Sequence, residues 1–180
     1  TSVETSQVFI TNLTTGVSKS ISGKFISSPR ISVWCDIDSD GFPEALVPNW
    51  SDGSSDFVVL YFKDTSFELE RWSSFQSGYR PRSLVCSDLN GDKFNDVIVV
   101  NNFADTISVF YSDAGLLKIG EQLSTEMEPG AAYVTDWNKD GLLDISVSNR
   151  RSNSLIVFEQ NKEGRFRSSL ALTFPLVDTP

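Results

Sequence analysis

Three stretches of the chain share one acidic pattern. Residues 36–44 read DIDSDGFPE, residues 88–96 read DLNGDKFND and residues 136–144 read DWNKDGLLD. Their first aspartates, at positions 36, 88 and 136, are separated by 52 and then 48 residues. A pattern that recurs at a period of this size indicates repeated structural units that stack on one another.

The repeat extends beyond the acidic residues. A proline stands seven residues before each first aspartate, and an asparagine stands five residues after each last acid. The prolines are Pro29, Pro81 and Pro129, and the asparagines are Asn49, Asn101 and Asn149. We expect each asparagine to cap the turn after the second strand of its unit. The first interval is longer than the second, and part of this difference lies in the loop at residues 50–56. Loops accept inserted residues at little cost in stability.

Short apolar runs surround the acidic stretches and have the length of strands. They are rich in Val, Ile, Phe and Tyr, the segments between them hold Asn, Asp, Gly and Ser, and no segment shows a sustained helical period. The predicted strands are residues 31–34, 45–47, 57–62, 83–85, 97–100, 107–111, 131–134, 145–147 and 155–158, with a fourth strand per unit at 67–72, 117–123 and 166–172. Four strands in about 48 residues are typical of a β-propeller blade.

The sequence thus predicts an all-β chain of antiparallel four-stranded blades. Residues 1–24 match the later half of a blade, 25–75, 76–124 and 125–172 form three repeats, and 173–180 form a tail. Closed propellers have roughly 4 to 8 blades, so about three and a half blades do not close a ring. We expect a partial propeller, part of a seven-bladed ring, whose remaining blades belong to a longer parent chain or to a second copy.

The acidic stretches have the ligand pattern of a cation-binding loop. Oxygen-bearing side chains at positions 1, 3, 5 and 9 and a backbone carbonyl at position 7 surround a hard cation, and glycine at position 6 permits the sharp turn. The candidate ligands are Asp36, Asp38, Asp40, Phe42 and Glu44 in the first loop; Asp88, Asn90, Asp92, Phe94 and Asp96 in the second; and Asp136, Asn138, Asp140, Leu142 and Asp144 in the third.

Mixed carboxylate, amide and carbonyl ligands on a flexible loop favour Ca²⁺ over Mg²⁺, and Zn²⁺ lacks its usual Cys and His ligands here. The alternative is that these acids only form turns and solvated charges. Three copies in register favour calcium, and we predict up to three structural Ca²⁺ ions. The first loop, with four carboxylates, should bind most tightly.

The second loop departs from the pattern. Lys93 occupies the turn position, and Gly91 stands two residues earlier. A left-handed backbone at Lys93 would cost on the order of 1 kcal/mol, and its ammonium group adds local positive charge. We predict the weakest of the three sites in this loop.

Composition excludes several classes of function. The chain has 180 residues, of which 39% are hydrophobic and 22% charged, so it folds around a core. Its net charge is −9 with no basic stripe, which argues against nucleic-acid partners. It contains no run of 18 apolar residues, so no membrane span is expected, and no histidine, which excludes histidine-dependent catalysis.

The two cysteines stand one and two positions before equivalent aspartates. Cys35 and Cys86 should therefore point to opposite faces on neighbouring strands, and we expect two buried thiols without a disulfide. Cysteine usage leaves the cellular compartment open. Trp34 lies on a predicted inner strand and is expected in the core.

The recurring proline, strand, DxDxDGxxD loop, strand and asparagine resemble the FG-GAP or VCBS repeats of integrin-alpha-like β-propellers, over nearly the whole chain. The resemblance implies blades around a central channel, with each acidic loop joining the first and second strands of its blade and binding calcium structurally. It also implies adhesion, carbohydrate recognition or protein-ligand roles in a secreted or cell-surface protein. The broader VCBS class fits better than an integrin subunit, because the Phe-Gly and Gly-Ala-Pro signatures are not evident.

Two glycosylation sequons begin at Asn12 and Asn49 and are compatible with a secretory route. The function we predict is a non-enzymatic extracellular scaffold for recognition or adhesion that binds a protein or a glycan. Trp50 and Trp72 are candidates for stacking on sugar rings. The alternatives are a carbohydrate-active enzyme such as a glycosidase or lyase, whose available carboxylates are largely claimed as ligands, and a purely architectural module of a surface assembly.

Overall fold

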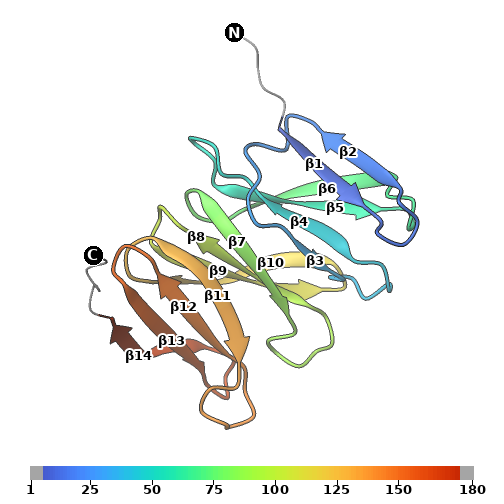
Figure 1. The fold of residues 1–180 in the computed structure, drawn as a ribbon. Helices are drawn as coiled ribbons and strands as arrows, with labels where there is room; N and C mark the ends of the chain where they lie inside the picture. Colours follow the sequence, from blue (N-terminus) through green and yellow to red (C-terminus); the bar gives the residue numbers. More distant parts are fainter. Residues whose placement is uncertain (1–5, 175–180) are drawn as a thin grey trace.

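A computed structural model describes residues 6–174 of the chain. These residues form fourteen β-strands and no helix, arranged as one hairpin and three four-stranded antiparallel sheets (Figure 1). The hairpin consists of β1 (Gln7–Thr11) and β2 (Ser18–Ser22). The first sheet contains β3 (Val33–Cys35), β4 (Glu44–Pro48), β5 (Asp56–Phe62) and β6 (Leu69–Gln76). The second contains β7 (Pro81–Ser87), β8 (Asp96–Asn101), β9 (Thr106–Asp113) and β10 (Leu116–Ser124). The third contains β11 (Pro129–Thr135), β12 (Asp144–Asn149), β13 (Ser154–Gln160) and β14 (Phe166–Thr173).

Strands that follow one another in the sequence are neighbours in each sheet, and each sheet is one propeller blade. The predicted all-β, four-stranded architecture is confirmed. Parts of the predicted half-blade 1–24 and tail 173–180, namely residues 1–5 and 175–180, lie outside the described residues.

The core lies between consecutive blades rather than inside one sheet. On β8, Val97 and Val99 pack against the first sheet, while Ile98 and Val100 pack against the third. A strand that is covered on both faces reads as a continuous apolar run instead of an alternating one. This explains why the second strand of the middle unit contains four consecutive β-branched residues.

The hairpin covers only part of the first sheet. Ile10 and Ile21 pack against residues of β4 and β5, including Ala45, on the face opposite to the second blade. Trp34 pairs with Ala45 in register and lies on that same face, but it is 47% exposed. The prediction that Trp34 lies in the core is wrong, because the buried contacts of the hairpin are with β4 and β5, the two middle strands, and Trp34 of β3 stays largely open on this side. The Trp34 ring instead contacts Phe62 and Phe67 at the surface.

The two cysteines form a disulfide, with Cα atoms 5.9 Å apart, and the prediction of two free thiols is wrong. Cys35 lies on the face of the first sheet that meets the second blade, and Cys86 pairs in register with Val97, which faces the first blade. If the two strands were neighbours in one sheet, cysteines on opposite faces would lie apart. The strands belong to consecutive blades, and each blade turns one face toward the other. The opposite orientation therefore brings the two cysteines together.

The repeated asparagines are buried at the end of the second strand of each blade: Asn101 and Asn149 are the last residues of β8 and β12, and Asn49 directly follows β4. Asn49 caps the following turn, as predicted, since its backbone N–H and its side-chain amide both donate to Asp56. It also holds the segment that enters the blade: its Oδ1 accepts from the N–H of Ser27 and its Nδ2 donates to the carbonyl of Phe25. Asn101 accepts from the N–H of Gly78 in the same way, at 2.9 Å.

Candidate cation-binding loops

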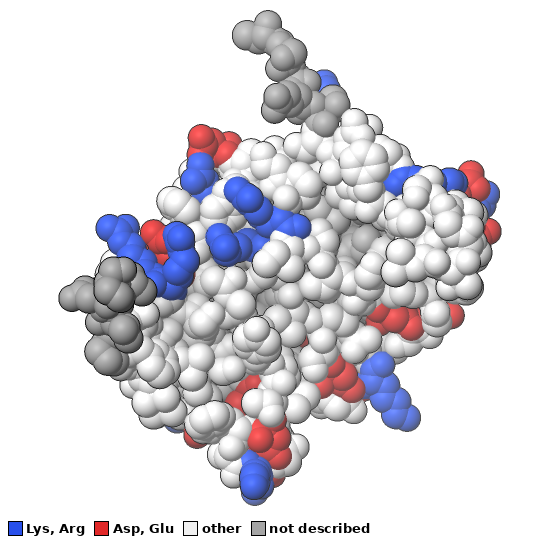
Figure 2. Space-filling view, in the orientation of Figure 1, with Lys and Arg blue, Asp and Glu red and all other residues white. Residues whose placement is uncertain are grey.

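The three acidic loops connect the first and second strands of their blades, between β3 and β4, β7 and β8, and β11 and β12. All three project from the same rim of the molecule (Figure 1). Figure 2 shows Asp and Glu side chains along the lower edge of the view, where these loops end. The sequence repeat therefore concentrates negative charge on one rim.

Each loop is organised by the same hydrogen bonds from backbone N–H groups to its own side chains. The first aspartate accepts from the sixth residue: Asp36 from Gly41 at 3.1 Å, Asp88 from Lys93 at 2.9 Å and Asp136 from Gly141 at 3.0 Å. The fifth residue accepts from the seventh: Asp40 from Phe42 at 2.7 Å, Asp92 from Phe94 at 2.8 Å and Asp140 from Leu142 at 2.9 Å. The loops thus share one conformation despite their different sequences.

Two positions of each loop, the fourth and the sixth, have a left-handed backbone. Lys93 has φ of 78°, so it adopts the left-handed backbone whose cost was considered above, and Gly91 has φ of 77°. In the other two loops the order is reversed, with Ser39 and Lys139 at the fourth position and glycine at the sixth. Every loop therefore carries one glycine and one non-glycine residue in this conformation. Backbone strain alone does not single out the second loop, and its distinguishing feature is the ammonium group of Lys93.

The first loop brings three predicted ligands together. Asp36, Asp38 and Asp40 each present an oxygen within 4.8 Å of the others. Oδ1 of Asp36 is buried and has no hydrogen-bond partner among the described residues. Burial raises the pKa of Asp38, and the neighbouring carboxylates Asp40 and Asp36 raise it further, against a hydrogen bond from the backbone of Asp40 that lowers it. A close group of carboxylates with an unpartnered buried oxygen fits a divalent cation.

The second and third loops are arranged differently at the third position. Asn90 donates from Nδ2 to Asp92 at 2.9 Å, and Asn138 donates to Asp140 at 3.0 Å. Both oxygens of Asp88 also accept backbone hydrogen bonds. These loops therefore satisfy their own oxygens more completely than the first loop does.

The ninth-position acids do not join the group of the first three side chains; they are buried at the base of each loop. Asp96 accepts from the N–H of Leu89 through Oδ2 and from that of Ser112 through Oδ1, both at 2.9 Å. Asp144 accepts from Trp137 and Gln160 in the equivalent way. Burial, against these hydrogen bonds, raises the pKa of Asp96 to about 6.

Glu44 is the longer counterpart in the first loop. It accepts from the N–H of Ile37 at 3.0 Å. Burial, together with the carboxylates of Asp38, Asp40 and Asp36 and against this hydrogen bond, raises its pKa to about 7. A bound cation would oppose both effects, since a nearby positive charge favours the ionised form.

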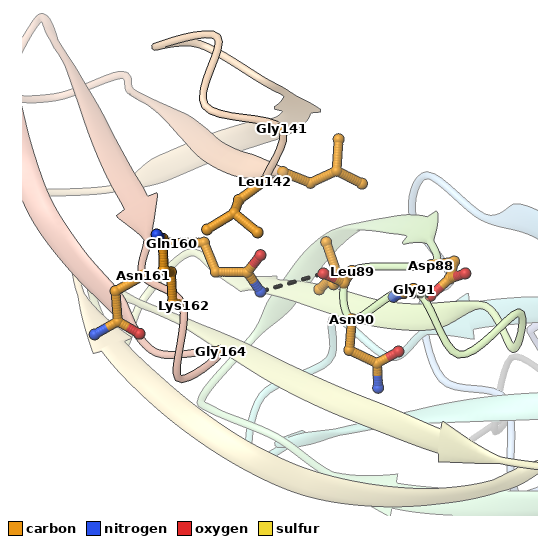
Figure 3. Close-up of a pocket in the computed structure, with 11 residues that line it drawn as sticks. Asp88, Leu89, Asn90, Gly91, Gly141, Leu142, Gln160, Asn161, Lys162 and Gly164 are labelled. Carbon is orange, nitrogen blue, oxygen red and sulfur yellow. Dashed lines mark hydrogen bonds between the residues drawn. The ribbon is translucent and has the colours of Figure 1, made fainter.

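In the first and second loops, the residue after the first aspartate links the loop to the next blade. The carbonyl of Ile37 accepts from Oγ of Ser112 at 2.7 Å, and the carbonyl of Leu89 accepts from Nε2 of Gln160 at 3.2 Å (Figure 3). Because Ser112 and Gln160 also donate their N–H groups to Asp96 and Asp144, one chain of hydrogen bonds runs through all three blades along the acidic rim. Sequence reasoning missed Ser112 and Gln160. Their signal is a polar residue sixteen positions after the last acid in the second and third repeats.

A cavity of about 410 Å³ lies between the second loop, the third loop and the turn after β13 (Figure 3). Asp88 and Asn90 line one side, and Leu142 and Asn161 line the other. The predicted ligands of two different loops thus border one hollow on this rim.

Comparison with known proteins supports the repeat and the fold. The family model for FG-GAP-like repeats matches residues 88–147. A search of curated proteins finds no match.

Three solved structures share the fold at low sequence identity. They are a Lactobacillus plantarum protein (TM-score 0.65, 16% identity) and proteins named as candidate 6-phosphogluconolactonases from Bacteroides uniformis (0.69, 13%) and Bacteroides fragilis (0.67, 15%). The similarity covers 94%, 96% and 96% of this chain but 51%, 52% and 52% of theirs, so the chain spans about half their length. Residues 88–147 therefore carry an FG-GAP-like repeat, set within the blades of a partial β-propeller.

Proposed function

We propose that this chain is a non-enzymatic recognition scaffold whose acidic loops bind calcium. The observation that carries the proposal is the group of Asp36, Asp38 and Asp40, whose carboxylates each place an oxygen within 4.8 Å of the others. The buried Oδ1 of Asp36, which has no hydrogen-bond partner among the described residues, supports it. Carboxylate and carbonyl oxygens on a flexible loop suit the six to eight ligands of Ca²⁺ better than the small octahedron of Mg²⁺. The shared conformation of the other two loops extends the proposal to up to three Ca²⁺ ions.

Calcium bound in a loop would stabilise the contact between blades as well as the loop. The N–H of Ile37 donates to Glu44, and its carbonyl accepts from Ser112 of the next blade. A cation that fixes the first loop therefore also fixes the residue that joins two blades. This coupling suits a scaffold that must present its surface turns in constant positions.

An extracellular or secreted location is part of the proposal. The Cys35–Cys86 disulfide supports an oxidising compartment, since disulfides are rare in the reducing cytosol. Within residues 6–174, no helix has the length and apolarity needed to cross a membrane. Asn49 is 3% exposed and its amide is engaged in hydrogen bonds, so a glycan at this sequon is incompatible with the fold. Asn12 is the sequon that remains.

The remaining blades are proposed to come from a longer parent chain or from a second copy, since the chain spans about half of the solved structures that it resembles. Light scattering on the 180-residue chain separates the two sources. A mass of 20.0 kDa, that of one chain, favours a parent chain, and twice that mass favours a second copy.

An enzyme is the second candidate, because two structures that share the fold carry a lactonase name. At 13% and 15% identity these likenesses concern the fold alone. An assay of 6-phosphogluconolactone hydrolysis, in which the acid that is released is measured, tests this candidate. The recognition proposal expects a rate equal to that of the buffer, and turnover above it would favour the enzyme.

A glycan array probed with and without a calcium chelator tests the recognition role. Binding to a glycan that weakens in chelator supports a scaffold whose fold depends on calcium. Turnover of a bound glycan would favour the enzyme. Absence of binding on the array, with calcium present, would overturn the glycan part of the proposal and leave protein contacts or an architectural role.

A further inference from the structure

The rim opposite to the acidic loops carries a compact group of arginine and aromatic side chains. It is built from the turns after β4 and β8, from the segments that lead into β3 and β7, and from the start of β7. We name it the Trp50 cluster, and it consists of Arg30, Trp50, Tyr79, Arg80, Arg82 and Phe103. Figure 2 shows basic side chains gathered toward the upper edge of the view, away from the acidic edge.

Three guanidinium groups surround the ring of Trp50. Their central carbons lie 4.9 Å (Arg30), 5.8 Å (Arg80) and 5.7 Å (Arg82) from the ring centroid. Phe103 meets the same ring edge to face, with centroids 5.7 Å apart. Interaction with the aromatic face stabilises a guanidinium group without neutralising its charge.

The backbone holds this cluster in place. The N–H of Trp50 donates to the carbonyl of Ser27 at 3.0 Å, and the N–H of Phe103 donates to the carbonyl of Tyr79 at 3.3 Å. The carbonyl of Arg80 accepts from the N–H of Asn102, which is buried. A ligand that binds here meets preformed turns, so it does not have to order a loop.

The positive charges of the cluster are not balanced locally. Arg80 forms an ion pair with Asp52, and its Nε is buried without a hydrogen-bond partner. Within residues 6–174, neither Arg30 nor Arg82 lies in an ion pair. Two unpaired guanidinium groups around one ring, in a chain of net charge −9, make a local positive field.

We infer that the Trp50 cluster binds an acidic saccharide, a sugar that carries carboxylate or sulfate groups. The planar guanidinium fork binds carboxylate and sulfate oxygens in pairs, and the exposed rings of Tyr79 and Phe103 offer faces for the C–H surface of a sugar. Nucleic acid fits less well, because its phosphates need a basic stripe and most of this chain repels them. The inference rests on the proposed recognition role and names its ligand class.

Isothermal titration calorimetry on the 180-residue chain tests the inference. The acidic probes are tetragalacturonate and a sulfated heparin tetrasaccharide; maltotetraose, inorganic sulfate and tetraglutamate serve as the neutral, free-anion and peptide comparisons. We expect at least one acidic saccharide to bind at least tenfold more tightly than all three comparisons. Equal or tighter binding of maltotetraose, sulfate or tetraglutamate overturns the assignment of ligand class, as does the absence of binding by both acidic saccharides.

A pair of double variants locates the site. Arg30→Gln with Arg82→Gln should weaken binding of the acidic saccharide at least tenfold. Arg150→Gln with Arg151→Gln removes the same charge near Glu128, outside the cluster, and should change it less than threefold. Equal weakening by both pairs, at unchanged melting temperatures, would mean general charge attraction and would overturn the site.

The calcium proposal and this inference fail separately. An array on which only neutral glycans bind leaves the recognition role standing and overturns this inference. A chain that binds acidic saccharides but is insensitive to calcium overturns the calcium sites and leaves this inference standing.

Discussion

Asp36 has two carboxylate oxygens in different surroundings: Oδ2 accepts from Gly41, whereas Oδ1 is buried without a partner among the described residues. Asp36→Asn should lower the number of bound Ca²⁺ ions by one and weaken calcium stabilisation, because it removes one ligand charge. In chelator the variant should melt at the same temperature as the parent or higher, since the repulsion from Asp38 and Asp40 is relieved.

Calorimetric titration and melting curves measure both effects of Asp36→Asn. Glu70→Gln, on the exposed strand β6, is the matched control and should behave as the parent does. A variant that binds calcium with the parent's affinity and stoichiometry would remove Asp36 from the ligands.

Lys93→Gly tests the second loop. Loss of the ammonium group removes a charge that repels the cation, which is worth on the order of 1 kcal/mol near a protein surface. We therefore expect the variant to bind calcium in this loop up to about fivefold more tightly. Lys93 has φ of 78°, and the lower cost of this conformation for glycine applies to the free and the bound loop alike, so it should raise the stability of the chain and not the affinity. Titration calorimetry decides, and equal or weaker binding by the glycine variant would reject the idea.

Residue patterns predicted the loop conformation but not all contacts. The left-handed backbone at Lys93 followed from alignment with Gly41 and Gly141, whereas that of Ser39 and Lys139 had no glycine to signal it. The buried position of Asp96 and Asp144 could not be predicted either. Their partners Ser112 and Gln160 lie in other strands, and only the fold brings them to the loop.

At the scale of elements, Asn101 joins the end of β8 to the segment before β7. Asn101→Ala leaves the N–H of Gly78, which is buried, without its acceptor, and such a loss costs about 1 to 3 kcal/mol. Urea unfolding should show a lower midpoint for this variant. Gln76→Ala, an exposed substitution on β6, is the control and should shift the midpoint little.

Gly78 gives an independent test of the same contact. A Cβ at this position would lie 2.7 Å from the side-chain amide of Asn101. Gly78→Ala should therefore also lower the free energy of unfolding. Combined with Asn101→Gly, which removes the Cβ of Asn101 at 2.8 Å as well as its amide, it should cost less than the sum of these two single changes. Additive effects would contradict the contact as described.

The strands could be predicted because apolar runs of strand length alternate with turn residues. The first strand was misplaced slightly: residues 31–34 were expected, and β3 is Val33–Cys35. Ile31 is apolar but exposed, so hydrophobicity alone extended the strand too far. The role of Asn101 as a turn cap was predicted, but its hydrogen bond with Gly78 was not. A repeat identifies a recurring residue, but it does not identify the residue that it contacts.

At the scale of the whole molecule, the disulfide ties two blades at their inner strands. Cys35 and Cys86 are 51 residues apart, and closing a loop of this length in the unfolded chain stabilises the fold by about 4 kcal/mol in the chain-entropy account. Cys35→Ala with Cys86→Ala should therefore lower the melting temperature, and a reducing agent should lower that of the parent but not of the variant. A parent melting curve that is insensitive to complete reduction would contradict this contribution.

The relation between blades was the part that sequence could not supply. The face of each cysteine was predicted from its place before an aspartate, but the conclusion reversed once the two strands were found in facing sheets rather than one. The prediction that Trp34 is buried failed for a similar reason, because its burial depends on how much of β3 the hairpin covers. The period of the repeat and its composition predict the strands of one blade. The contacts between blades depend on which face of each sheet packs against its neighbour.

We propose that the acidic loops bind calcium and thereby stabilise the blades. A thermal melt of the chain in chelator and then in increasing CaCl₂, with MgCl₂ and matched NaCl as comparisons, tests this proposal. We predict that the melting temperature rises with calcium around 10⁻⁴ to 10⁻³ M and rises less with magnesium. At ten times the Kd of a site, the bound ion should add about 1.4 kcal/mol to the free energy of unfolding. A melting temperature that calcium leaves unchanged, or that NaCl of equal ionic strength raises as much, would contradict the account.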